Sequence, residues 1–145
     1  MGLNVTATIE RAAHLIGVYL DPTASALKIT QGEAHVLAHL ARNGPTAIAA
    51  LHREFGHKRS TLTNIIDRLE GRKLVRRRLN PSDRRSFVVS LTASGSRTAQ
   101  RAKEALDELE RELTALVAER DLAGVAAVTR SLQALVEQQY SASTA

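Results

Sequence analysis

The spacing of apolar positions predicts a chain built mostly of helices. Between residues 59 and 71, Leu62, Ile65, Ile66 and Leu69 recur at the i, i+3, i+4 and i+7 spacing of one helix face. Comparable stripes predict further helices at about residues 6–20, 30–43, 46–56, 93–116 and 122–139. The pattern is therefore typical of a mainly α fold.

Local signals set the expected ends of these helices. Asp21-Pro22 is expected to end the first helix. Thr30 and Glu33 fit a capping box for the second helix. Thr46 is expected to cap the third helix, which a glycine turn joins to the helix of residues 59–71, and Thr92 is expected to cap the helix of residues 93–116. A helix, a glycine turn and a polar-faced helix predict a helix-turn-helix.

Strand periodicity replaces helical periodicity after residue 73. An apolar pair at 74–75 begins one extended run, and residues 86–91 place three apolar side chains on one face of a second run. The sequence Asn-Pro-Ser-Asp at 80–83 has the residues of a tight turn. A hairpin directly after the polar-faced helix is the layout of a winged helix-turn-helix.

The face opposite the apolar stripe of residues 59–71 carries small polar side chains. Its members are Ser60, Thr63, Asn64 and Asp67, with Thr61 and Arg68 at the edge. Short donors and acceptors of this kind can contact base edges in a major groove of DNA.

Positive charge is concentrated in the same stretch. Residues 57–85 carry ten cationic side chains against three anionic ones, a net charge of +7, whereas the whole chain carries +5. A local positive field attracts phosphate backbones and speeds encounter with them. Helix, turn and charge together favour double-stranded DNA as the partner; the alternative is a solvated basic strand at Arg76–Arg78.

Composition narrows the class of protein further. A chain of 145 residues is long enough for one domain with its own core. It has no cysteine, which excludes disulfides and thiolate metal sites. The N-terminal stretch has neither a basic lead nor a long apolar run, so we expect no signal peptide or membrane span and a cytoplasmic location. No nucleophile–base pair, phosphate-binding glycine loop or carboxylate dyad is present, so neither an enzyme nor a cofactor is expected.

The outer helices are more apolar than a small DNA-binding lobe needs. In residues 93–116 the apolar positions follow a heptad-like 3-4 spacing. They are Ala99, Ala102, Leu106, Leu109, Leu113 and Leu116. We expect helices within 1–20 and 93–140 to pair with a second chain; the alternative is a helical hairpin packed within one chain.

The order of elements resembles the MarR family of bacterial transcriptional regulators, over nearly the whole chain. The resemblance is sharpest from Ser60 to Gly95, in STLTNIIDRLEGRKLVRR and NPSDRRSFVVSLTASG. Asp-Arg-Arg followed by Leu-Thr-x-x-Gly is a fairly specific combination. Two positions depart from the family pattern, because Asn64 stands where Arg is common and Lys73 where Gly usually precedes Leu-Val.

The resemblance implies a fold and a function. The fold is mainly α with a small β-hairpin wing, a single domain over 1–145. Residues 30–92 form the DNA-binding lobe, and 1–20 and 93–140 supply the dimerisation helices. The implied function is that of a homodimeric repressor that binds a pseudo-palindromic operator and is released by a small aromatic effector. The alternative is a helical protein-interaction module whose basic hairpin binds an acidic partner protein.

The resemblance also assigns roles to individual residues. Ser60, Thr61, Thr63, Asn64 and Arg68 would face the major groove. Arg85 would enter the minor groove from the wing tip, and Asp83 would hold the arginines by a charge-assisted hydrogen bond. The remaining DNA-binding residues, which would mostly meet phosphates, are Arg59, Arg76, Arg77, Arg78 and Arg84.

The histidines allow two further hypotheses. His35 and His39 lie one helical turn apart near Glu33, the spacing of a divalent metal site, but two ligands on one helix are too few to predict a metal. The family resemblance implies an effector pocket, which His14, Tyr19 and His39 could line.

Overall fold

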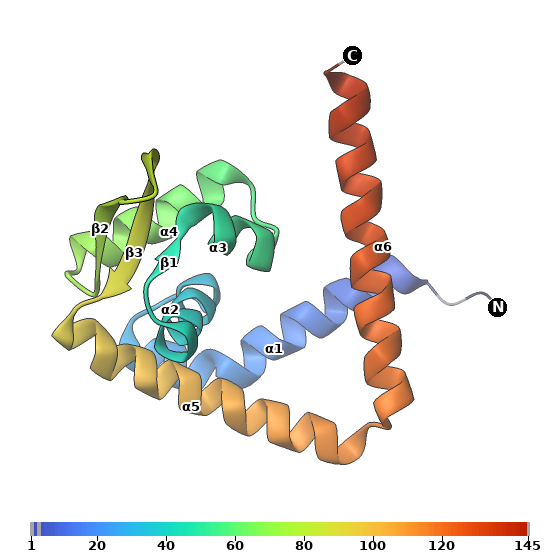
Figure 1. Cartoon of the computed structure of the whole chain (residues 1–145). Coiled ribbons are helices and arrows are strands. Elements are labelled where there is room, and N and C mark those ends of the chain that lie inside the picture. Colours follow the sequence, from blue (N-terminus) through green and yellow to red (C-terminus); the bar gives the residue numbers. More distant parts are fainter. Residues whose placement is uncertain (1, 3, 145) are drawn as a thin grey trace. The chain divides into compact units, whose positions relative to one another are not determined.

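The computed structural model describes residue 2 and residues 4–144, and it is mainly helical with one small antiparallel sheet (Figure 1). The order is α1 (Val5–Leu27), α2 (Gln31–Asn43), β1 (Thr46–Ala47), α3 (Ile48–Phe55), α4 (Arg59–Gly71), β2 (Val75–Asn80), β3 (Asp83–Leu91), α5 (Ala93–Leu116) and α6 (Glu119–Ser143). The chain divides into two compact units, residues 1–107 and 108–145. The predicted fold class is confirmed.

Helix α1 runs past Pro22, and the prediction that this proline ends it is wrong. A proline inside a helix removes its own N–H from the helix ladder, and its ring crowds the carbonyl of residue i−4. Stopping before it would expose Ala24 and Leu27, which are buried in the last turns of α1. The helix ends instead at Lys28, in the left-handed region with φ 57°, where the Arg72 guanidinium donates to the Lys28 carbonyl at 2.6 Å. Tertiary packing therefore outweighs the missing hydrogen bond.

The predicted capping box of α2 is confirmed. The Glu33 backbone N–H donates to Thr30 Oγ1, and the Thr30 N–H donates to Glu33 Oε2, each at 3.1 Å. Glu33 is buried at 4% exposure. Its carboxylate thus fixes the start of α2 from inside the unit.

The prediction that Thr46 caps α3 is wrong. Thr46 and Ala47 form β1, which pairs with Val89 and Val88 of β3, and α3 begins at Ile48 without a side-chain cap. The Thr46 hydroxyl donates instead to the Gly44 carbonyl at 2.9 Å, so it does not cap α3. The predicted two-stranded hairpin is consequently part of a three-stranded sheet of order β1-β3-β2.

The apolar stripe of α4 lies at the centre of the core. Leu62, Ile66 and Leu69 are almost completely buried, together with residues of α2, α3 and the sheet. The largest fully buried partners are Val36, Leu37, Leu40, Leu51, Val75 and Val89. Burying one face of α4 this thoroughly leaves its opposite face fixed toward solvent.

The start of α5 lies directly against the beginning of the hairpin. Thr92 caps it as predicted, because Thr92 Oγ1 accepts the Gly95 N–H at 2.9 Å and donates to the Lys73 carbonyl at 2.6 Å. A Cβ on Gly95 would lie 1.7 Å from the Leu74 carbonyl oxygen. Lys73 itself has φ 60°, a left-handed conformation that explains why glycine is usual there.

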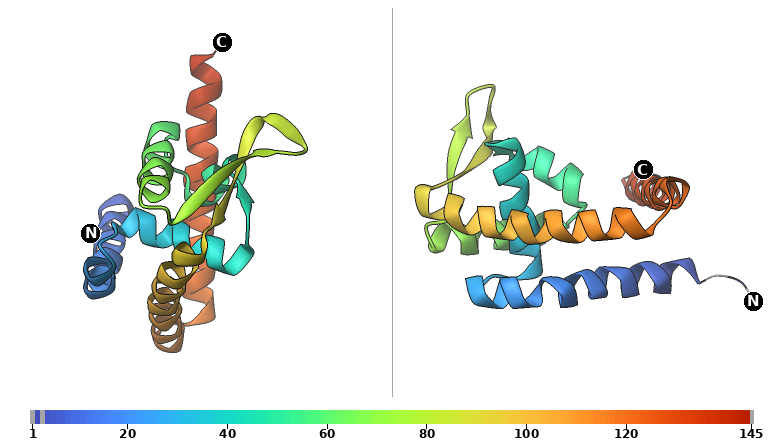
Figure 2. Two further views of the ribbon diagram at one scale, coloured as in Figure 1. Left: turned by 90° about the vertical axis from the view of Figure 1, so that its left-hand side faces the viewer. Right: turned by 90° about the horizontal axis from the view of Figure 1, so that it is seen from below.

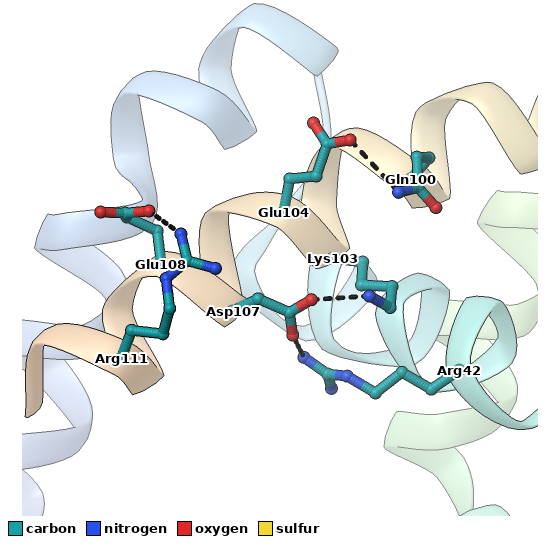
Figure 3. Close-up of polar contacts among 7 residues, drawn as sticks. All are labelled: Arg42, Gln100, Lys103, Glu104, Asp107, Glu108 and Arg111. Atoms are coloured by element: carbon teal, nitrogen blue, oxygen red, sulfur yellow. Dashed lines mark hydrogen bonds and ion pairs between the residues drawn. The ribbon is translucent and has the colours of Figure 1, made fainter. Parts of the chain in front are cut away.

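Further along, α5 is tied to α2 by an ion-pair cluster (Figure 3). Asp107 accepts from Arg42 at 2.7 Å and from Lys103 at 2.6 Å. The hydrogen bonds from Lys103 and then Arg42 hold the pKa of Asp107 below its usual range. Asp107 is the last residue of the first unit.

In residues 108–145 the apolar side chains stay largely uncovered. No residue of α6 is buried. Its exposed large apolar residues are Val125, Leu132, Leu135, Val136 and Tyr140. Across the described part of the chain, no helix combines the length and apolarity needed to span a membrane.

Candidate nucleic-acid interface

The solvent face of α4 carries an exposed row of polar side chains. Ser60, Thr61, Thr63 and Asn64 are all exposed. None of these four side chains has a hydrogen-bond partner within residues 4–144. The start of α4 at Lys58 also lacks a side-chain cap. Donors and acceptors without protein partners are therefore presented together along one helix face.

The wing, defined as the hairpin of β2 and β3, extends away from the neighbouring helices (Figure 2). Its tip is held by short polar contacts: Asn80 Oδ1 accepts the Ser82 N–H and Asp83 Oδ1 accepts the Arg85 N–H, each at 3.0 Å. Asp83 thus holds Arg85 through the backbone amide. The Arg84 and Arg85 side chains are exposed.

Two of the predicted DNA-binding arginines are engaged within the protein. Arg68 Nε donates to Glu33 Oε1 at 2.8 Å, although half of the Arg68 side chain remains exposed. The Arg77 guanidinium lies 2.6 Å from Asp67 and 2.9 Å from Glu70. Charge counting along the sequence could not reveal these pairings, because the partners come from other elements.

The other cations of the stretch have no ion-pair partner among the residues that the structure describes. They are Lys58, Arg59, Arg72, Lys73, Arg76, Arg78, Arg84 and Arg85, of which Arg72 binds backbone carbonyls. Most of the positive charge of residues 57–85 is therefore not neutralised by ion pairs within the protein.

A recess of about 280 Å³ lies between α3, α4 and the wing. Its lining brings together three predicted residues, Arg59, Thr63 and Arg85. His52 and Phe87 also line it and were not predicted as site residues. The alternation of β3 placed Phe87 with the core-facing side chains, yet it is 41% exposed. No local signal distinguishes it, because the strand extends beyond the helices that would cover it.

A second recess, of about 530 Å³, lies between α1 and the start of α2. His14 lines it together with polar groups of Asp21, Thr30 and Gln31. Tyr19 and His39 are not among its lining residues. The structure therefore does not bring the three predicted effector residues together in this recess.

Most of the histidines gather elsewhere, near the turn between α3 and α4. The rings of His39 and Phe55 meet edge to face at 5.6 Å, and His57 stacks on Phe55 at 5.8 Å. Burial lowers the pKa of His35, and the nearby charges of Arg42 and His57 lower it further. Within the described ranges, no group of three or more His, Asp or Glu side chains is arranged to hold a metal ion.

Known proteins resemble this chain in both sequence and fold. Residues 29–87 match the MarR family. The HTH-type transcriptional regulator PecS of Dickeya dadantii (strain 3937) is 34% identical over 120 residues, which cover 81% of this chain and 72% of PecS.

Two solved structures are similar in fold. The S. aureus MepR–DNA complex has a TM-score of 0.74 at 20% identity, covering 92% of this chain and 99% of that one. NadR in complex with 4-hydroxyphenylacetate has a TM-score of 0.74 at 22% identity, covering 90% of this chain and 93% of the NadR chain. The interaction-module alternative is not favoured. The chain belongs to the MarR family of DNA-binding transcriptional regulators.

Proposed function

We propose that this protein is a homodimeric repressor that binds a pseudo-palindromic operator and leaves it when a small aromatic effector binds. One observation carries the proposal: Thr63 of the unpartnered polar row of α4 and the wing arginine Arg85 line the same recess. The helix would enter a major groove and Arg85 the adjacent minor groove. Arg59, Arg76, Arg78 and Arg84 would supply phosphate contacts.

The dimer part of the proposal rests on uncovered apolar surface. Helix α6 exposes apolar side chains along its length, and Leu113 and Leu116 of α5 are also exposed. A helix with an uncovered apolar stripe gains little stability in water on its own. A second copy of the chain would cover α1, α5 and α6 and would place two α4 helices to address half-sites about 10 base pairs apart.

The effector part of the proposal rests on the recess beside His14. Apolar Val18, Pro22 and Ile29 line it along with the polar groups already described, a mixture that suits a small ring bearing polar substituents. NadR binds 4-hydroxyphenylacetate, which supports a ligand of similar size. Of the residues predicted from sequence, His14 stays in this proposal, while Tyr19 and His39 do not line the recess.

The operator can be identified by selecting bound duplexes from a random DNA pool. On the selected operator, Arg85→Ala should weaken binding by roughly 1–3 kcal/mol per half-site and flatten the preference for A·T-rich flanks. Arg84→Ala is the matched control at the neighbouring position of the strand. It should weaken all duplexes alike and reduce the salt slope by about one.

Anisotropy titrations at several salt concentrations measure both effects. A pool that shows no enrichment would contradict sequence-specific binding. An Arg85→Ala protein with unchanged affinity and flank preference would contradict the assignment of the wing.

A further inference from the structure

Arg77 joins the first strand of the wing to α4. Its Nη2 atom lies 2.6 Å from Asp67 Oδ1 and 2.9 Å from Glu70 Oε1. Its backbone N–H also donates to Glu70 Oε2, at 3.2 Å. Both the side chain and the main chain of one strand residue are therefore bound to adjacent turns of the helix that presents the polar row.

The strand register explains why Arg77 faces the helix. Arg77 is paired with the fully buried Val89, and Val75, two residues earlier, lies on the same inward face. Arg76 and Arg78 point to the other face and are exposed. The Arg77 side chain is only 27% exposed. A guanidinium that loses hydration needs hydrogen-bonded partners, and the two carboxylates provide them.

The same pairing changes the surface that meets DNA. Asp67 is exposed on α4 beside Thr63 and Asn64, where a free carboxylate would repel phosphates. The hydrogen bond from Arg77 lowers the pKa of Glu70, and the same bond raises the pKa of Arg77. Glu70 and Arg77 therefore both keep their charge around neutral pH.

We propose that Arg77, Asp67 and Glu70 form a clamp that positions the wing relative to α4, so that Arg85 and the polar row reach the same half-site in register. Arg77 is then a positioning residue and not a phosphate contact. This inference rests on the proposed operator binding. It is independent of the effector.

The clamp and a phosphate role predict opposite effects when the carboxylates are removed. If Arg77 met phosphates, Glu70→Gln and Asp67→Asn would release it and tighten binding to every duplex. If the clamp positions the wing, both changes should weaken operator binding, by roughly threefold or more. Glu54→Gln is the matched control, because it removes an exposed, unpaired carboxylate of α3 without touching the clamp. It should leave operator binding equal or slightly tighter.

Substitutions of Arg77 add a second, independent readout. Arg77→Lys keeps a positive charge but cannot bridge both carboxylates as a guanidinium does. We expect Arg77→Lys and Arg77→Gln to lose operator affinity to a similar extent, with the salt slope unchanged and the loss concentrated at the flanks contacted by the wing. Full rescue by lysine, together with a slope lowered by about one in Arg77→Gln, would overturn the clamp in favour of a phosphate contact.

Amide hydrogen exchange of the free protein separates the clamp from the operator hypothesis. Glu70→Gln should speed exchange of the β2 amides while the α2 and α5 amides keep their protection, which also shows that the variant is folded. Unchanged β2 exchange would overturn the clamp even if operator binding is confirmed. Faster β2 exchange in a protein that selects no DNA sequence would support the clamp as a structural contact. It would contradict the proposal that the protein binds an operator.

Discussion

Gly95 is the glycine at which an added Cβ would come nearest to another atom. Its missing side chain allows the first turn of α5 to lie against the Leu74 carbonyl, and an added Cβ would come within 1.7 Å of that oxygen. The Leu74 carbonyl directly precedes β2 and accepts the Thr92 N–H at 3.0 Å, so it cannot move as a flexible side chain can. We therefore predict that Gly95→Ala lowers the free energy of unfolding by roughly 3 kcal/mol, the upper end of typical overpacking costs.

Gly71→Ala provides the control for this prediction. Gly71 is also helical, but nothing is within 4 Å of its added Cβ. Alanine should there be neutral or stabilising by up to about 1 kcal/mol, because it favours helix. Urea unfolding at one fixed protein concentration measures both variants. Equal stability of the two would contradict the close approach at Gly95.

At the scale of single residues, the sequence predicts only part of the site. The polar row of α4 and the arginines of the wing tip follow from periodicity and turn chemistry, both of which are local. The partners of Arg68 and Arg77 do not. Glu33 lies 35 residues before Arg68 along the chain, and only folding brings the two together.

At the scale of elements, the Asp107 cluster joins α5 to α2 and should contribute modestly to stability. Its side chains are about a third exposed, with 32% for Asp107 and 41% for Arg42, and pairs of this exposure contribute roughly 0.5–1 kcal/mol. Asp107→Asn should lose that amount at pH 7. Glu112→Gln, which removes an exposed carboxylate of α5, should lose almost nothing.

The same pair predicts a pH dependence. The pKa of Asp107 is lowered in the folded protein, so the unfolded chain takes up a proton at higher pH than the folded one. The stabilisation is complete above the unfolded value of about 3.9 and disappears as pH falls through the lower folded value. Unfolding curves of wild type and Asp107→Asn should therefore converge on acidification below about pH 4. A difference that persists there would contradict the assignment.

Elements were predictable where their signals were local. The capping box of α2, the turn of the wing and the Thr92 cap each depend on residues a few positions apart. The end of α1 and the start of α3 were missed because distant contacts determine them. Arg72 binds the end of α1 across 44 residues, and β1 forms only because β3 returns beside it.

At the scale of the whole molecule, α6 provides the test of the dimer. At 100° per residue, Leu132 lies in the exposed apolar stripe of α6, whereas Ala134 lies on the opposite face. Leu132→Glu should yield a monomer in light scattering at micromolar concentration and weaken operator binding, since a single half-site is then held alone. Ala134→Glu adds the same charge to the same helix and should stay dimeric. A monomeric wild-type protein would contradict the proposed assembly.

Among the residues that the structure describes, the strand order β1-β3-β2 leaves one side of β2 without a strand partner. An unpaired strand edge can template pairing with another chain, and thus aggregation, unless charge or shape prevents it. Arg76 and Arg78 are exposed along this edge. Two such edges that approached each other would bring these guanidinium groups together. The arginines proposed to contact phosphates would thus also oppose edge-to-edge aggregation of the free protein.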